Sequence, residues 1–173
     1  MKLVVLDANA YWTEQLFSNC PVFDEVLLLK PREVRAHWSQ HGSVLGDGTP
    51  RRIGDRLWEQ TISMMPGWLD AGWPLARWWL TRTIRAFVRD EPYALVLCFP
   101  QYRSILDILA PRLSIYYNYD DYRDNWPHRE ETLPDAEDDL VQRSDLTICI
   151  AKYRSEVLSE RVPEQANRIF HVP

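Results

Sequence analysis

The chain has 173 residues, 46% of them hydrophobic and 26% charged, a balance typical of one globular domain with its own core. The net charge of −5 argues against a general nucleic-acid-binding protein. The N-terminal apolar run is short and is interrupted by Asp7, so it predicts neither a signal peptide nor a membrane-spanning helix. Cys20, Cys98 and Cys149 lie far apart, without the spacing of a zinc site, which favours reduced, structural cysteines and a cytoplasmic location.

Six apolar runs of strand length follow one another along the chain. They cover residues 2–7, 25–30, 94–99, 114–119, 146–150 and 168–173. Their residues are apolar on both faces instead of alternating, as in parallel strands that are covered on both sides. The sequence therefore favours a mainly parallel sheet over an antiparallel one.

Segments with helical spacing separate the later strands. Leu80, Ile84, Phe87 and Val88 form one apolar stripe, residues 105–109 predict a shorter helix, and two more are expected after Pro134 and over 153–161. Residues 31–75 are rich in glycine and predict mostly loop. The order of elements predicts a single α/β domain over 1–173, doubly wound and Rossmann-like, with a mainly parallel sheet flanked by helices.

Polar residues follow several of these strands. In an open α/β sheet, ligands bind outside the carboxyl ends of the strands, so these positions are the candidate substrate-binding residues. They are Asp7, Asn9, Gln101, Tyr102, Arg103, Tyr119 and Lys152. The first turn lacks the GxGxxG of a dinucleotide fold, and no phosphate-binding GxxxxGK[ST] loop is present. No cofactor is therefore expected in this domain.

Asp120 and Asp121 come directly after an apolar strand, in the run SIYYNYDDYRDNW. They could close the strand by accepting hydrogen bonds from loop amides, contact a substrate, or hold a divalent cation. Adjacent side chains at a strand end usually diverge, so no metal site is predicted here. His128 follows in the same loop and is either solvated or a general base. Asp120, Asp121 and His128 are thus the candidate catalytic residues.

Two segments of opposite charge lie in the middle and later parts of the chain. Residues 51–90 hold five of the eight tryptophans and seven arginines against four acids. This composition suits peripheral contact with an anionic membrane, and it also suits a solvated basic helix over a tryptophan-rich core. Residues 119–145 hold ten acids against three arginines. Most of these acids are expected in the first turns of the helix after Pro134.

The order SIYYNYDDYRDNW, DAEDDLVQRSDLTICIAKYRSEVL and NRIFHVP resembles the N-terminal domain of GT-B glycosyltransferases, similar to glycosyltransferase family 4. The resemblance covers about residues 93–173. The glycine-containing first loop of that family is absent, and Ala151-Lys152 replaces its usual serine after the sixth strand.

The resemblance implies an enzyme of polysaccharide biosynthesis that transfers a sugar from a nucleotide sugar to a glycan or lipid-linked acceptor. This chain would be its acceptor-binding half. The nucleotide-sugar donor would bind a C-terminal domain beyond Pro173, so the isolated half is expected to be inactive. The alternative is a non-catalytic, flavodoxin-like module that binds a protein partner, because Asp7, Asp120 and Lys152 partly fit a receiver pattern.

Overall fold

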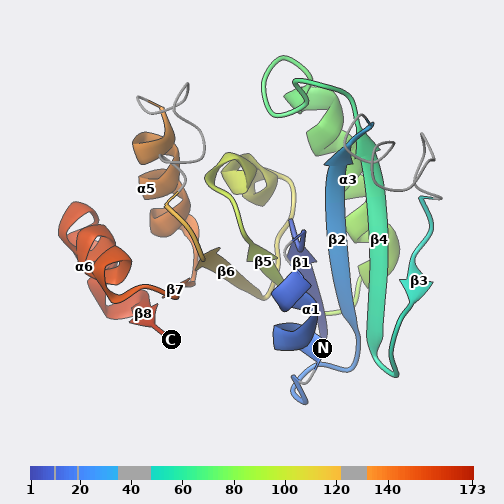
Figure 1. Ribbon diagram of the computed structural model, residues 1–173, viewed down its shortest axis with the longest axis horizontal. Coiled ribbons are helices and arrows are strands. Elements are labelled where there is room, and N and C mark those ends of the chain that lie inside the picture. The colour runs from blue at the N-terminus through green and yellow to red at the C-terminus, as the bar shows by residue number, and fades with distance from the viewer. Residues whose placement is uncertain (10, 19, 35–47, 122–131) are drawn as a thin grey trace. The chain divides into compact units, whose positions relative to one another are not determined.

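The computed structural model describes residues 1–9, 11–18, 20–34, 48–121 and 132–173. The chain is an α/β protein with eight strands in a mostly parallel sheet flanked by helices, consistent with a Rossmann-like doubly wound fold (Figure 1). This confirms the predicted fold class. The chain forms two compact units, Met1–Ala94 and Leu95–Pro173. The expectation of a single domain stays a prediction.

The described residues of the first unit form strands and helices. They are β1 (Lys2–Leu6), α1 (Tyr11–Ser18), β2 (Val26–Glu33), β3 (Arg51–Arg52), β4 (Leu57–Met64) and α3 (Trp73–Val88). The strand order is β3-β4-β2-β1; β1, β2 and β4 run parallel, and the two-residue β3 is antiparallel to β4. The apolar residues of β1 and the first part of β2 are buried on both faces, as the sequence predicts.

Helix α3 packs through one side and exposes the other. Pro74 near its start suits the first turn, where its missing N–H is not needed, and Arg89 ends the helix in a left-handed conformation. Leu80, Ile84 and Val88 are buried and Phe87 is half-buried, so the predicted stripe is the packed side of the helix.

The second unit alternates strands with helical segments. After β5 (Tyr93–Leu97), whose first two residues belong to the first unit, come η1 (Pro100–Asp107), β6 (Leu113–Asn118), α5 (Leu133–Arg143), β7 (Leu146–Cys149), α6 (Lys152–Arg161), η3 (Pro163–Arg168) and β8 (Ile169–His171). The order is β5-β6-β7-β8, and β6, β7 and β8 are parallel. All six expected strands are therefore present.

Two expectations about local structure were wrong. Strand β4 lies within the stretch expected to be mostly loop; its residues alternate between buried and half-buried and include Glu59, Gln60 and Thr61, so no apolar run marks it. The helix expected over 105–109 is a 3-10 segment, η1, which begins earlier, at Pro100. In both places tertiary packing decides the structure against a weak local signal.

Candidate functional site

The carboxyl ends of β6 and β7 lie side by side in the second unit. Asn118 is in register with Cys149, and the backbone N–H of Ile150 donates to the carbonyl of Asn118 at 3.2 Å. Because the strands are parallel, the residues after both of them leave the sheet at the same edge. Asp120 and Asp121 follow β6, and Lys152 follows β7, at this common edge.

A buried polar network lies directly behind this edge. The Glu137 carboxylate of α5 accepts hydrogen bonds from the Tyr116 hydroxyl at 2.8 Å and from Asn118 Nδ2 at 2.9 Å. It also pairs with Arg154 of α6, whose guanidinium lies 2.6 Å away. The side chains of Arg154 and Glu137 are only 3% and 7% exposed. Burying these charges is costly unless they are paired and hydrogen-bonded, and here each has several partners.

The same guanidinium connects the network to the strand end. Arg154 lies 3.4 Å from the Asp121 carboxylate and 3.4 Å from the Asn118 side-chain oxygen. A second arginine, Arg161, pairs with the other oxygen of Glu137 at 3.0 Å. The buried Arg154 guanidinium thereby fixes the Asp121 carboxylate just after the end of β6.

Burial and charge shape the ionisation of this network. Burial raises the pKa of Tyr116 well above its ordinary value, and the negative charge of Glu137 raises it further, so its hydroxyl keeps its proton. Burial would lower the pKa of Arg154, but the charge of Glu137 and the hydrogen bond to it outweigh burial and raise it. Tyr116 therefore stays neutral and Arg154 stays charged, so both side chains serve as fixed supports of the strand end.

Neither Glu137 nor Arg154 was singled out from the sequence. Most acids around Pro134 were expected to cover the first turns of the following helix, but Glu137 is buried and paired with two arginines. The one usable signal was Asn118, a polar residue at the end of an otherwise apolar strand. A buried side-chain amide requires partners, which points to polar residues on the covering helices.

The groups in front of the network are accessible. Asp120 is exposed, and the Lys152 side chain is 76% exposed and lies 3.7 Å from Glu156 at the surface. Exposed pairs of this kind contribute little, so the ammonium can turn to a ligand. The edge thus combines carboxylates, which accept hydrogen bonds from hydroxyl groups, with a cation that can bind an anion.

The other predicted residues of the second unit have different surroundings. Tyr102 is fully buried, with its ring 6.0 Å from that of Phe99, so its side chain is not presented to solvent. Arg103 forms an ion pair of 3.2 Å with Asp139, and the Tyr119 ring lies 6.2 Å from that of Tyr117. Gln101 is half-buried and lies in η1, the segment that also carries Tyr102 and Arg103.

The predicted residues of the first unit gather at the end of β1. Asp7 adopts a left-handed backbone conformation, with φ 72°, which aspartate tolerates better than most residues. Asn9 donates to the Asp7 carboxylate and, at 3.0 Å, to the carbonyl of Pro31, while Arg32 donates to Asn9 at 3.3 Å. Asp7 and Asn9 are therefore held in one local network with the end of β2.

The remaining predictions concern His128, metal binding and membrane-spanning helices. His128 lies outside the described residues. Within the described ranges, no three His, Cys, Asp or Glu side chains group closely enough to hold a metal ion. No helix in the same ranges is long and apolar enough to cross a membrane.

Comparison of the chain with protein-family models and with curated protein sequences finds no match. The glycosyltransferase resemblance therefore depends on the sequence motifs and stays a proposal.

Proposed function

We propose that the chain is the acceptor-binding half of a glycosyltransferase that moves a sugar from a nucleotide sugar to a glycan or lipid-linked acceptor. The observation that carries this proposal is the common edge where Asp120, Asp121 and Lys152 leave β6 and β7. Sugar hydroxyls are donors that carboxylates accept well, and Arg154 holds Asp121 in place for that purpose.

The proposed roles follow from exposure and charge. Asp120 and Asp121 orient the acceptor hydroxyl, and one of these carboxylates or His128 removes its proton as the sugar is transferred. Lys152 contacts an anionic part of the acceptor, such as the phosphate of a lipid-linked sugar. A separate donor domain supplies the nucleotide sugar, so we expect no sugar transfer from residues 1–173 alone.

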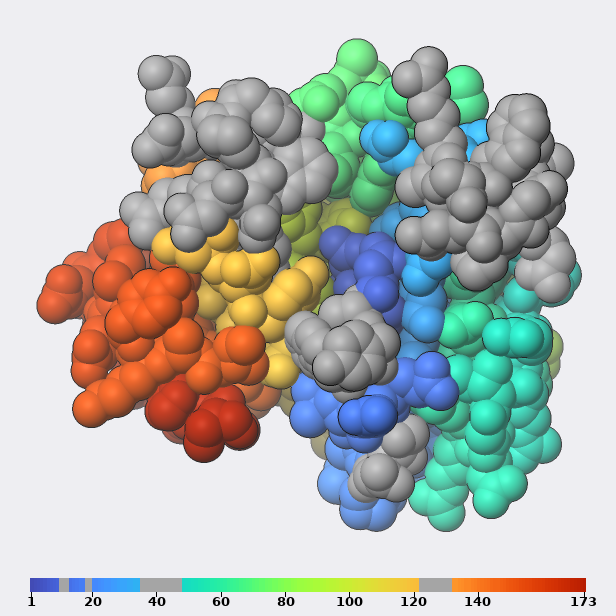
Figure 2. Space-filling view, viewed as in Figure 1, coloured from blue at the N-terminus to red at the C-terminus, as the bar shows by residue number. Residues whose placement is uncertain are grey.

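An exposed apolar patch of the second unit suits contact with that donor domain. Ile150, Tyr153, Phe170 and Val172 are between 40% and 51% exposed, and Val172 is joined to β7 by a 2.9 Å bond from its N–H to the Cys149 carbonyl. Figure 2 shows the orange and red atoms of α6 and β8 at the surface. Apolar side chains gathered in this way are typical of a surface that a partner covers.

The outer side of α3 suits contact with a membrane that carries a lipid-linked acceptor. Leu75, Trp78 and Trp79 are 65%, 56% and 42% exposed, and Arg82, Arg85 and Arg89 continue the same exposed side. Aromatic and basic side chains together bind the interface of anionic bilayers. The triple change of these arginines to glutamate should abolish co-sedimentation with phosphatidylglycerol vesicles. No association of the parent chain would remove this part of the proposal.

A glycan array tests the acceptor role directly. The 173-residue chain should retain one structurally related group of glycans, and Asp120→Asn and Asp121→Asn should lose most of that signal. Glu164→Gln, which neutralises an exposed carboxylate on η3, is the matched control and should bind as the parent does. Retention of no glycan, or equal retention by the two aspartate variants, would contradict the proposal.

The second candidate is a non-catalytic, flavodoxin-like module that binds a protein partner. Asp120 and Lys152 follow the carboxyl ends of neighbouring parallel strands, and this favours the module because a receiver has an aspartate and a lysine after its strands. Incubation with acetyl phosphate followed by mass spectrometry distinguishes the two proposals. Phosphorylation of a single aspartate would support the module, and none is expected of an acceptor domain.

A further inference from the structure

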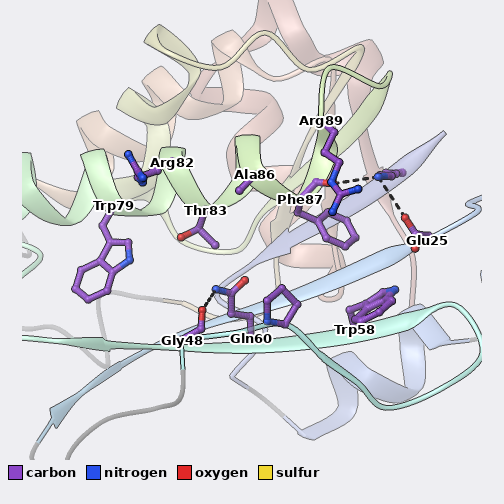
Figure 3. Close-up of a pocket in the computed structure, with 12 residues that line it drawn as sticks. Glu25, Gly48, Trp58, Gln60, Trp79, Arg82, Thr83, Ala86, Phe87 and Arg89 are labelled. Atoms are coloured by element: carbon purple, nitrogen blue, oxygen red, sulfur yellow. Dashed lines mark hydrogen bonds and ion pairs between the residues drawn. The ribbon is translucent and has the colours of Figure 1, made fainter.

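A groove of about 620 Å³ lies between α3 and β4 in the first unit (Figure 3). Its lining includes Trp58 and Gln60 from β4 and Trp79, Arg82, Thr83 and Arg89 from α3 and its end. It also includes Lys2 and Glu25, at the amino ends of β1 and β2, whereas Asp7 and Arg32 mark the carboxyl ends. The groove is therefore a different place from the strand-end residues described above. Its volume falls in the range of small-molecule sites.

Each end of the groove has one tryptophan and one arginine. Figure 3 shows Trp79 at one end and Trp58 at the other, with Gln60 between them. Arg82 lies at the Trp79 end, and Arg89 lies at the Trp58 end. An indole ring offers a flat, electron-rich face, and a guanidinium offers a planar set of donors for a carboxylate. Each end thus suits a ring that carries an anion.

Gln60 supplies a polar group in the middle. It is 6% exposed, and its Nε2 donates to the Gly48 carbonyl at 2.5 Å. Its Oε1 is buried and has no hydrogen-bond partner among the described residues. Figure 3 shows this amide directed into the space below α3. Leaving a buried acceptor unpaired is unfavourable, so the groove is suited to a ligand that donates a hydrogen bond at this point.

The free charge of the groove is positive. Lys2 is occupied: it pairs with Glu91 at 2.9 Å and with Glu25 at 3.3 Å, and it donates to the Phe87 carbonyl at 3.0 Å. Arg82 and Arg89 form no ion pair within the described part of the chain, although Arg82 lies 5.6 Å from the Trp78 ring. Two guanidinium groups therefore remain for a ligand, which favours a dianion over a neutral molecule.

We propose that this groove binds an acidic disaccharide unit of a glycan, with one uronic acid ring at each tryptophan–arginine pair. The C–H face of each sugar packs on an indole, each carboxylate meets a guanidinium, and a hydroxyl near the glycosidic bond donates to Gln60 Oε1. A neutral disaccharide leaves both arginines without a partner. A mononucleotide carries one flat ring and occupies one aromatic end only. The proposal is independent of any sugar transfer at the strand ends. It uses Trp79, Arg82 and Arg89, so a glycan in the groove and the proposed membrane contact of α3 exclude each other.

Titration of the 173-residue chain with digalacturonate and dimannuronate tests this inference. The readout is the indole N–H signals of Trp58 and Trp79 in ¹⁵N-labelled protein, assigned from Trp58→Phe and Trp79→Phe. Both signals should shift and saturate with at least one of the acidic disaccharides. Galactobiose and mannobiose, which have the same ring number without carboxylates, should bind at least about tenfold more weakly, as expected for two lost charged contacts. Acetate at equal carboxylate concentration should leave both indole signals in place.

Matched variants locate the site. Trp79→Ala and Arg82→Ala should weaken binding about tenfold or more, whereas Leu75→Ala and Arg85→Ala, exposed on the same helix and outside the groove, should stay within about twofold. Arg89→Gly removes the other guanidinium at a left-handed position that glycine prefers, so it should lose affinity without losing the fold. The inference fails if neither acidic disaccharide shifts the two signals, if the neutral disaccharides bind equally well, or if Trp79→Ala binds as the parent does.

Discussion

The Arg154 guanidinium lies 2.6 Å from the Glu137 carboxylate, and both side chains are almost completely buried. This pair joins α6 to α5 and, through Asn118 and Asp121, to the end of β6. It fixes the position of the edge at which we place acceptor binding. The stability of the second unit and the geometry of its proposed site therefore depend on the same contacts.

Removal of one member of this pair should be strongly destabilising. Arg154→Met leaves the Glu137 charge buried with Arg161 as its remaining cation, and we expect a loss of about 3–5 kcal/mol in the free energy of unfolding. Urea denaturation followed by circular dichroism measures it. Lys152→Ala, two residues away and exposed, should change the free energy by less than about 0.5 kcal/mol. Equal effects of the two changes would show that the buried pair is not structural.

The Tyr116 hydroxyl should contribute separately. Tyr116→Phe removes its hydrogen bond to Glu137 and the one that it accepts from Asn118 at 2.9 Å. We expect a loss of about 1–3 kcal/mol, because one partner is a charged carboxylate. The same denaturation series with Tyr153→Phe, an exposed tyrosine of α6, should show almost no change. An unchanged free energy of unfolding in Tyr116→Phe would mean that Glu137 does not need the hydrogen bond from this hydroxyl.

Glu59 should make stability depend on pH in the acid range. Burial alone would raise its pKa, but the hydrogen bond and charge of Lys30, with Arg51, outweigh burial and hold the pKa below 4.5. A lowered folded-state pKa stabilises the protein above the unfolded-state value, and this contribution is lost as the pH falls through the folded-state pKa. The stability difference between the parent and Glu59→Gln should therefore shrink from neutral pH to below pH 4.5.

Lys30→Gln provides the control for that measurement. Without Lys30, the main cause of the lowered pKa is absent, so introducing Glu59→Gln in this background should give a smaller pH-dependent difference. A difference that stays constant with pH in the parent background would contradict the assignment.

The cysteines should differ in reactivity. Burial raises the pKa of Cys149 to about 12, and Cys98 is also buried, whereas Cys20 is half-buried. Because the thiolate is the reactive form, native protein at about pH 8 should react rapidly at Cys20 only. Ellman's reagent should titrate one thiol in native protein and three in guanidinium chloride, and Cys20→Ser should abolish the native reaction. Rapid native labelling of Cys149 would contradict its burial.

The sequence predicts the strands well because each carries its own apolar run. Val4, Leu28 and Leu95 are buried on strands that can be read without any knowledge of their neighbours. Strand β4 carries no such run, and Leu57–Met64 forms a strand by pairing along its whole length with the adjacent β2. The strand structure of β4 depends on its neighbour in the sheet, so the local sequence pattern alone does not predict it.

The candidate site could be predicted in part for the same reason. The positions of Asp120, Asp121 and Lys152 follow from the rule that parallel strands end at one edge. Glu137 and Arg154 come from two helices that are separated along the chain by β7, and no spacing in the sequence announces that they meet.

The affinity of the 173-residue chain for the glycan that it retains on the array tests the acceptor-binding proposal most directly. Isothermal titration of that glycan into the parent and into the double variant Asp120→Asn/Asp121→Asn compares the two dissociation constants. Loss of hydrogen bonds to charged carboxylates predicts binding at least about tenfold weaker in the variant, with an unchanged circular dichroism spectrum. Equal dissociation constants for the two proteins would contradict acceptor binding at the ends of β6 and β7.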